Sequence, residues 1–280
     1  MQRILVPCDF SAPAIEAYKF ALEIASASNG EIFILKAIDL PIMLAGGFDV
    51  QPYTFDPSIL RDLEEGAKKS YSKMKAKFST GHSPASFHVK IGAVMPVIRE
   101  FINDKKIDLV IMGTHGSTGF NEFFFGSNTE KIVRVSPVPV LSVRKTTSVS
   151  SIKKILFPST LELNQPELIN HVKSLQDFFG ATLHILWVNT PIFFKRDKEI
   201  HALLEAFVKH YELSNYSLNI RNDTFEAYGI VSFANEITAD IIAMSTHGRR
   251  GLAHLISGSI AEEVLNYMQC PIWTYSISKK

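Results

Sequence analysis

A glycine-containing signature that occurs twice constrains this chain more than any other feature. The tetrapeptide Gly-Thr-His-Gly at residues 113–116 is followed by nine residues and then by Gly-Ser at residues 126–127. The same spacing returns 132 positions later, as Ser-Thr-His-Gly at residues 245–248 and Gly-Ser at residues 258–259. Other landmarks recur in the same order, which indicates that the chain contains two copies of one structural unit.

The two copies differ in length. Ile-Leu-Val-Pro at residues 4–7 matches Ile-Leu-Phe-Pro at residues 155–158, an offset of 151, so the second copy is 19 residues shorter in its middle. Much of the difference falls near residues 41–57, where the composition favours an irregular surface loop over a flap above a site. The polar stretch at residues 145–151 predicts a linker between domains at residues 1–145 and 152–280.

Short runs of valine, isoleucine and leucine alternate in each copy with segments of helical period. This alternation is typical of right-handed βαβ units around a parallel sheet. The predicted strands are residues 2–7, 31–38, 86–91, 107–112, 138–143, 153–158, 181–188, 216–221, 240–245 and 272–276. The predicted helices are residues 12–28, 58–79, 93–104, 127–136, 165–179, 195–213, 227–238 and 259–269.

Charge, apolar run length and cysteine count limit the kinds of partner and the compartment expected for this chain. Lys and Arg number 29 against 28 Asp and Glu, so the net charge of +1 gives no general attraction to nucleic acid or anionic membranes. No apolar run approaches the 18 residues of a membrane span. The two cysteines, Cys8 and Cys270, lie far apart without metal-binding spacing, which favours a reducing cytoplasm.

An open parallel sheet binds ligands beyond the carboxyl ends of its strands, where the strand order reverses. Glycines after a strand expose backbone amides, and a following helix start adds donors and a positive dipole end. The two glycine loops are therefore candidate phosphate sites. Simpler roles stay open, because Asp9 could cap the helix that begins near Ser11, and Ser127 with Glu130 satisfies a capping box, as does Ser259 with Glu262.

With these motifs in place, the chain resembles the universal stress protein family, and in particular its tandem two-domain members. The resemblance rests on the glycine loops and on the opening motif Val-Pro-Cys-Asp-Phe-Ser at residues 6–11. It implies two doubly wound α/β sandwiches of the adenine nucleotide alpha hydrolase-like type, each a five-stranded parallel sheet of order 3-2-1-4-5. We expect the halves to pair through their last strands as an internal pseudo-dimer; a further homodimer stays open.

The resemblance also implies an adenine nucleotide such as ATP, with or without magnesium, in the N-terminal half. Pro7, Cys8 and Asp9 would meet the adenosine end, and Ile38 would line the adenine pocket. Met112, Gly113 and Gly116 would approach the ribose and phosphates. Gly126, Ser127, Asn128 and Thr129 would hold the phosphate oxygens.

The second copy departs from this pattern, since Thr160 stands where the first copy has Asp9 and Ser245 where it has Gly113. Its loop carries Arg249, Arg250 and His254, whereas the loop of the first copy has no Lys or Arg. Loss of a hydrogen-bonded carboxylate costs roughly 1.5–3 kcal/mol, and loss of a partly exposed cation about 0.3–1 kcal/mol. The better site is therefore expected in the first copy.

No motif of a catalyst is present. The chain lacks a P-loop and a nucleophile elbow. His115 and His247 read as local hydrogen-bonding groups, and Cys8 as a small packing residue, so no catalytic residue and no metal ligand is predicted. Together with the resemblance, the lack of these motifs favours a non-catalytic stress-response regulator with an unidentified protein partner. A nucleotide-free scaffold, an apolar-ligand binder and a weak ATPase stay open as alternatives.

Overall fold

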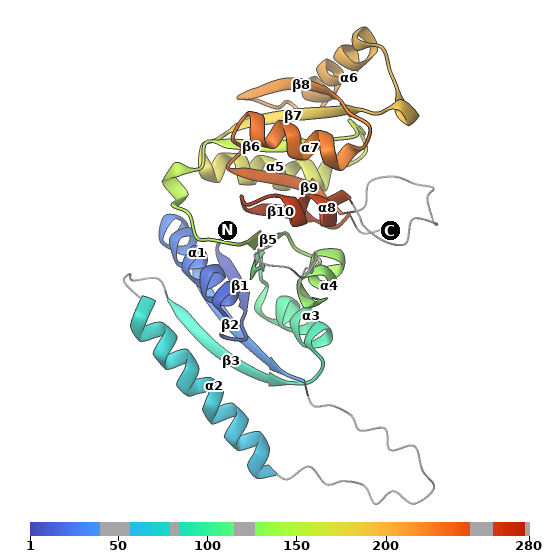
Figure 1. The fold of residues 1–280 in the computed structure, drawn as a ribbon. Helices are drawn as coiled ribbons and strands as arrows, with labels where there is room; N and C mark the ends of the chain where they lie inside the picture. The colour runs from blue at the N-terminus through green and yellow to red at the C-terminus, as the bar shows by residue number, and fades with distance from the viewer. Residues whose placement is uncertain (40–56, 79–83, 115–126, 247–259, 278–280) are drawn as a thin grey trace, which may run out of the picture.

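The computed structural model describes residues 1–39, 57–78, 84–114, 127–246 and 260–277. Ten strands form one sheet in the order β3-β2-β1-β4-β5-β10-β9-β6-β7-β8. All neighbouring strands are parallel except β5 and β10, which are antiparallel. Figure 1 shows the two halves meeting at these two central strands.

Each half contributes five strands and four α-helices within the described residues. The N-terminal half contains β1 (Arg3–Pro7), α1 (Ala12–Ser28), β2 (Glu31–Ile38), α2 (Pro57–Phe78), β3 (Ala85–Ile91), α3 (Val94–Lys105), β4 (Leu109–Gly113), α4 (Ser127–Val135) and β5 (Val140–Val143). The 3-10 turn η1 (Val149–Ser151) follows in the linker. The C-terminal half contains β6 (Lys154–Pro158), α5 (Pro166–Phe179), β7 (Thr182–Asn189), η2 (Pro191–Phe193), α6 (Asp197–His210), β8 (Tyr216–Asn222), α7 (Glu226–Glu236), β9 (Ile241–Ser245), α8 (Ile260–Tyr267) and β10 (Ile272–Tyr275).

Helix α1 shows how local sequence fixes an element beside the cleft. Ser11 is its N-cap, and the Ser11 hydroxyl accepts a hydrogen bond from the backbone N–H of Ala14 at 3.4 Å. Pro13 occupies the first turn, where its missing N–H needs no partner. Asn29 ends the helix in the left-handed conformation, with φ of 52°. The buried face is lined with small and apolar side chains, which brings α1 close to the sheet.

The seam between the halves is a short antiparallel ladder that pairs Trp273 with Leu141 and Thr274 with Val140. Related contacts tie helices across the seam. Arg144, just after β5, donates to the carbonyl oxygens of Leu265 and Asn266 near the end of α8. The hydroxyl of Ser276, just after β10, donates to the carbonyl oxygen of Arg134 near the end of α4. Residues 144 and 276 are equivalent in the internal repeat, so equivalent residues of the two halves make matching contacts across the seam.

The core also joins the two halves. One cluster of buried apolar side chains runs continuously under α1, α5 and α6, from Ile4 in β1 to Trp273 in β10. The opposite face of the sheet carries two separate clusters, one under α3 and α4 and the other under α7 and α8. Because the continuous cluster spans β5 and β10, the seam is part of the hydrophobic core.

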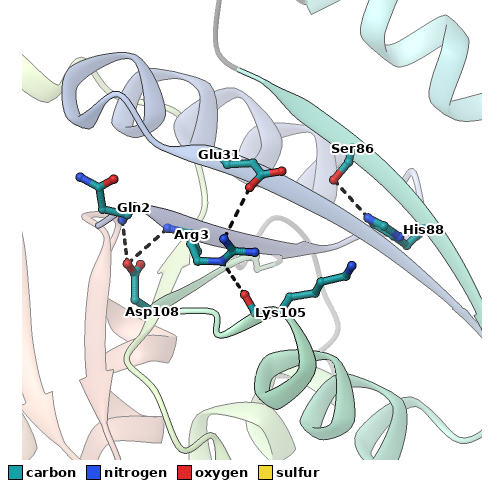
Figure 2. Close-up of polar contacts among 7 residues, drawn as sticks. All are labelled: Gln2, Arg3, Glu31, Ser86, His88, Lys105 and Asp108. Carbon is teal, nitrogen blue, oxygen red and sulfur yellow. Dashed lines mark hydrogen bonds and ion pairs between the residues drawn. The ribbon is translucent and has the colours of Figure 1, made fainter.

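A repeated polar clamp fastens the amino ends of the first strands, away from their carboxyl ends. The Asp108 carboxylate accepts from the backbone N–H groups of Gln2 at 2.7 Å and Arg3 at 3.2 Å (Figure 2). Arg3 also donates to the carbonyl oxygen of Lys105. Asp240 accepts in the same way from the backbones of Lys153 and Lys154. This clamp has an aspartate at the same place in both copies, a repeat that the sequence reasoning did not use.

The linker is fastened to α1 by Glu16. The Glu16 carboxylate accepts from the backbone N–H and the hydroxyl of Thr146, both at 2.8 Å, and pairs with Lys19 at 2.6 Å. Partial burial disfavours the ionised form, but the hydrogen bonds from Lys19 and Thr146 outweigh it and bring the pKa of Glu16 to about 2. The ionised carboxylate is therefore a stabilising contact between α1 and the linker.

Glu16→Gln is expected to lower the free energy of unfolding by about 1–2 kcal/mol at pH 7. The folded pKa lies below the ordinary value of 4.5, so this contribution is complete above pH 4.5 and is lost as the pH falls toward 2. Urea denaturation at pH 7, 4 and 3 measures the difference from wild type, with exposed Glu23→Gln as control. A difference that stays constant over this range would contradict the role given to Glu16.

The fold predicted from the sequence is confirmed. Each half has the order 3-2-1-4-5, and the last strands pair. All ten predicted strands and eight predicted helices are present, with ends that differ by no more than three residues. The two 3-10 turns, η1 and η2, were not predicted, because three residues are too few to establish a period. The predicted loop near residues 41–57 lies almost entirely outside the described residues.

Candidate functional site

A cleft of about 340 Å³ lies at the carboxyl ends of β1, β2 and β4. The chain leaves β1 for β2 on one side and later returns to β4 on the other, so this is the point where strand order reverses. The cleft is lined by Pro7, Cys8, Asp9, Ser11, Pro13, Ala14, Leu35, Lys36, Ala37, Val94, Ile98, Met112, Gly113, Thr114, Thr129 and Ile132. Its size and mixed polar and apolar lining are typical of a small-molecule site.

Six of the predicted site residues come together here. Pro7, Cys8, Asp9, Met112, Gly113 and Thr129 all line the cleft. Ile38 is buried but does not line the cleft; its neighbours Lys36 and Ala37 do. Gly116 and Gly126 lie outside the described residues. Ser127 and Asn128 form the first turn of α4, whose Thr129 faces the cleft, and their side chains are not described.

Asp9 presents an exposed carboxylate at the end of β1. Its Oδ1 accepts from the backbone N–H of Ser11 at 2.9 Å, while Ser11 itself caps α1. Asp9 therefore orients the capping residue without being the cap. Desolvation favours the neutral form, but hydrogen bonds from Ser11 and the charge of Lys36 outweigh it and lower the pKa of Asp9 below 3.8. The site thus offers an ionised hydrogen-bond acceptor at neutral pH.

Cys8 directly precedes Asp9 in the chain and is 5% exposed. Its backbone N–H donates to the carbonyl oxygen of Leu35 at 2.9 Å, which holds the end of β1 against β2. Burial raises the pKa of the Cys8 thiol to about 11, so the thiol stays protonated at neutral pH. This environment favours the packing role predicted for Cys8, since a reactive cysteine needs a thiolate.

Gly113 is required by packing in the structure. A Cβ atom on Gly113 would lie 2.0 Å from the carbonyl oxygen of Pro13 and 2.1 Å from its carbonyl carbon. The first turn of α1 therefore contacts β4 where only glycine fits. The next backbone N–H, that of Thr114, donates to the carbonyl oxygen of Val143 at 2.8 Å. The glycine loop motif predicts a role for Gly113 toward an anion, whereas this contact with α1 depends on tertiary packing.

The equivalent positions in the C-terminal half carry different chemistry. The registers pair Pro7 with Leu35 and Pro158 with Leu186, so Trp187 is equivalent to Lys36. Thr160 replaces Asp9, as the sequence comparison indicated. Trp187 is 5% exposed and belongs to the core. An aromatic ring and a hydroxyl thus replace the cation and the carboxylate of the N-terminal half.

Helix packing differs between the halves as well. Val188 stands where the N-terminal half has Ala37, and a Cβ on the facing Gly229 would lie 2.6 Å from a methyl group of Val188. Helix α5 begins at Pro166, three residues later than the equivalent of Ala12. Because α5 starts later, the C-terminal half has no helix turn at the position equivalent to Pro13. Its strand β9 can therefore carry Ser245 where the N-terminal half requires Gly113.

Neither His115 nor His247 lies within the described residues. In the part of the chain that the structure describes, no group of three or more His, Cys, Asp or Glu side chains could hold a metal ion. Among the same residues, no helix is long and apolar enough to cross a membrane.

The fold and the cleft together define a tandem α/β protein with a cleft at the strand-order reversal of its first half. A family model described as the universal stress protein family matches residues 1–144 and 221–276. The chain therefore belongs to the universal stress protein family.

Individual relatives agree with this assignment. Universal stress protein Slr1230 of Synechocystis sp. is 25% identical over 293 aligned positions, covering 98% of this chain and all of the relative. The crystal structure of a universal stress protein from Archaeoglobus fulgidus has a TM-score of 0.76 at 20% identity and covers 98% of both chains, which shows the shared fold.

Proposed function

We propose that the N-terminal half binds an adenine nucleotide, such as ATP, and that the protein acts as a non-catalytic regulator in stress responses. The observation that carries the proposal is the cleft at the strand-order reversal, which brings Asp9, Gly113 and Thr129 together. A ligand there would contact residues from β1, β2, β4 and α4 at once. Occupancy could then change how these four elements sit against one another, as a regulator requires.

The residues that line the cleft can contact both the adenosine end and the phosphate end of a nucleotide. Leu35, Val94 and Ile98 offer an apolar wall for a base, and the ionised Asp9 can accept hydrogen bonds from the adenine amino group or a ribose hydroxyl. Thr129 lies in the first turn of α4, where unpaired backbone N–H groups and the helix dipole favour phosphate oxygens. We place the phosphates at this end, together with Ser127, Asn128 and the predicted loop glycines Gly116 and Gly126.

The expected role is ligand sensing without turnover. Hydrolysis needs a positioned base or metal near the phosphates, and the described residues that line the cleft include no histidine or glutamate. Any magnesium ion would be bound mainly by the phosphates of the nucleotide, as is usual for this ion. We place the protein in the cytoplasm, where adenine nucleotides are abundant and both thiols stay reduced. We also propose a protein partner that binds the ligand-bound state in preference to the ligand-free state.

Asp9→Ala is expected to weaken ATP binding about tenfold or more, because it removes a charged hydrogen-bond acceptor from the adenosine end. Thr160→Ala, at the equivalent position of the C-terminal half, is expected to change the dissociation constant less than about twofold. Isothermal titration calorimetry measures both, and Asp9→Asn separates charge from shape.

Equal effects of the Asp9 and Thr160 substitutions would contradict the placement of the site. Because Asp9 also orients Ser11, circular dichroism of each variant checks that α1 is intact. Absence of ATP, ADP and AMP binding by wild type would favour the nucleotide-free scaffold instead. Phosphate release that disappears in Asp9→Ala would show a weak ATPase and contradict the non-catalytic assignment.

A further inference from the structure

Lys36 is a cation in the cleft that the sequence motifs do not account for. It lies near the carboxyl end of β2, lines the cleft and is partly buried. Within the described part of the chain its ammonium group forms no hydrogen bond and no ion pair. Partial burial removes some of the hydration of an ammonium group, so an anion in the cleft would stabilise this charge. A ligand with an anionic group can supply that partner.

Asp9 does not satisfy Lys36. Among the described residues that line the cleft, Asp9 carries the only carboxylate, and its Oδ1 accepts from the backbone N–H of Ser11 at 2.9 Å. No ion pair within 4 Å joins Lys36 and Asp9 in the structure. The two residues are close enough for the charge of Lys36 to act on Asp9, yet the lysine remains available to a second anion.

The position of Lys36 across the sheet indicates which part of a nucleotide it would meet. Strand β1 separates β2, which carries Lys36, from β4 and the first turn of α4. Neighbouring strands are about 4.8 Å apart, so β2 and β4 are separated by roughly 10 Å. In the proposed binding mode the 5′-phosphates lie toward α4, and adenine carries no charge. The anion nearest Lys36 would therefore be attached to the ribose.

We infer that Lys36 binds a phosphate on the ribose, so that the preferred ligand is an adenine nucleotide phosphorylated at the 2′- or 3′-position as well as at the 5′-position. This inference rests on the proposed function, because it assumes that adenine nucleotide occupies the cleft. The C-terminal half has Trp187 at the equivalent position and offers no such charge. The inference therefore applies to the N-terminal half alone.

Calorimetric titration with three matched ligands tests the inference: AMP, adenosine 3′,5′-bisphosphate and adenosine 2′,5′-bisphosphate. Wild type is expected to bind at least one bisphosphate about tenfold more tightly than AMP. In Lys36→Met this gain should fall below about twofold, and Lys36→Arg should retain most of it. Lys90→Met is the control, because Lys90 is exposed on β3 beside Ala37 and does not line the cleft.

The outcomes separate this inference from the function on which it rests. If wild type binds AMP or ATP but gains nothing from a ribose phosphate, the inference is wrong and the proposed function stands. A gain that survives in Lys36→Met, or that Lys90→Met removes equally, also overturns the role of Lys36. If wild type binds none of these nucleotides, both the proposed function and the inference are wrong.

Discussion

Gly113→Ala is expected to lower the free energy of unfolding by about 3 kcal/mol, one of the two largest effects that the structure predicts for a single substitution. The added Cβ would lie 2.0 Å from the carbonyl oxygen of Pro13, a backbone atom that cannot rotate away. Helix α1 would have to move from β4, which would disturb the cleft and the core together. Urea denaturation followed by circular dichroism measures the loss.

Gly66→Ala is the matched control for this prediction. Gly66 lies within α2, and nothing stands within 4 Å of a Cβ added there. Alanine is the better helix former, so this variant is expected to gain about 0.5–1 kcal/mol. A Gly113→Ala protein as stable as wild type would show that α1 and β4 are not in the close contact described here.

Trp273→Ala is expected to destabilise the protein by about 3–5 kcal/mol. Trp273 is 1% exposed, pairs with Leu141 across the seam and belongs to the core cluster that both halves share. Its removal would leave a large cavity where the two halves meet. The same denaturation experiment measures the effect, and circular dichroism avoids relying on the fluorescence of the residue removed.

Phe225→Ala is the control for Trp273, because Phe225 is also aromatic but is 56% exposed. We expect this variant to remain within about 0.5 kcal/mol of wild type. If both substitutions had equally small effects, the antiparallel seam would not be a stabilising interface. Limited proteolysis provides a second measurement, since a weakened seam should expose the linker to cleavage in Trp273→Ala before Phe225→Ala.

The fold could be predicted because its signals are periodic and occur twice. Buried parallel strands require continuous apolar runs, and the helices between them require an apolar face. Because the pattern occurs in both copies, each predicted strand or helix in one half was supported by its equivalent in the other. The linker contact between Glu16 and Thr146 could not be predicted in this way, because it joins residues that are distant in sequence without a shared period. The aspartate clamp was available from the repeat, since Asp108 and Asp240 share the offset of 132.

The sequence could predict which strand ends form the cleft, but not every residue that lines it. Residues directly after β1 and β4 meet at the strand-order reversal for topological reasons, which is why Asp9 and Gly113 lie in one cleft. In β2, Ala37 lines the cleft and Ile38 does not, so the role predicted for Ile38 stays a prediction. The packing role of Gly113 depends on where α1 begins, and Lys36 is a single charge without a motif. Both required the structure.

A crystal structure grown with excess AMP would show whether the cleft of the N-terminal half holds an adenine nucleotide. We predict electron density for the nucleotide at the carboxyl ends of β1 and β4, with a ligand nitrogen or hydroxyl within about 3.2 Å of the Asp9 carboxylate and the phosphate toward the start of α4. A fully formed cleft that stays free of AMP and, in a second crystal, of ATP, or nucleotide bound only elsewhere, would contradict nucleotide binding in the N-terminal half.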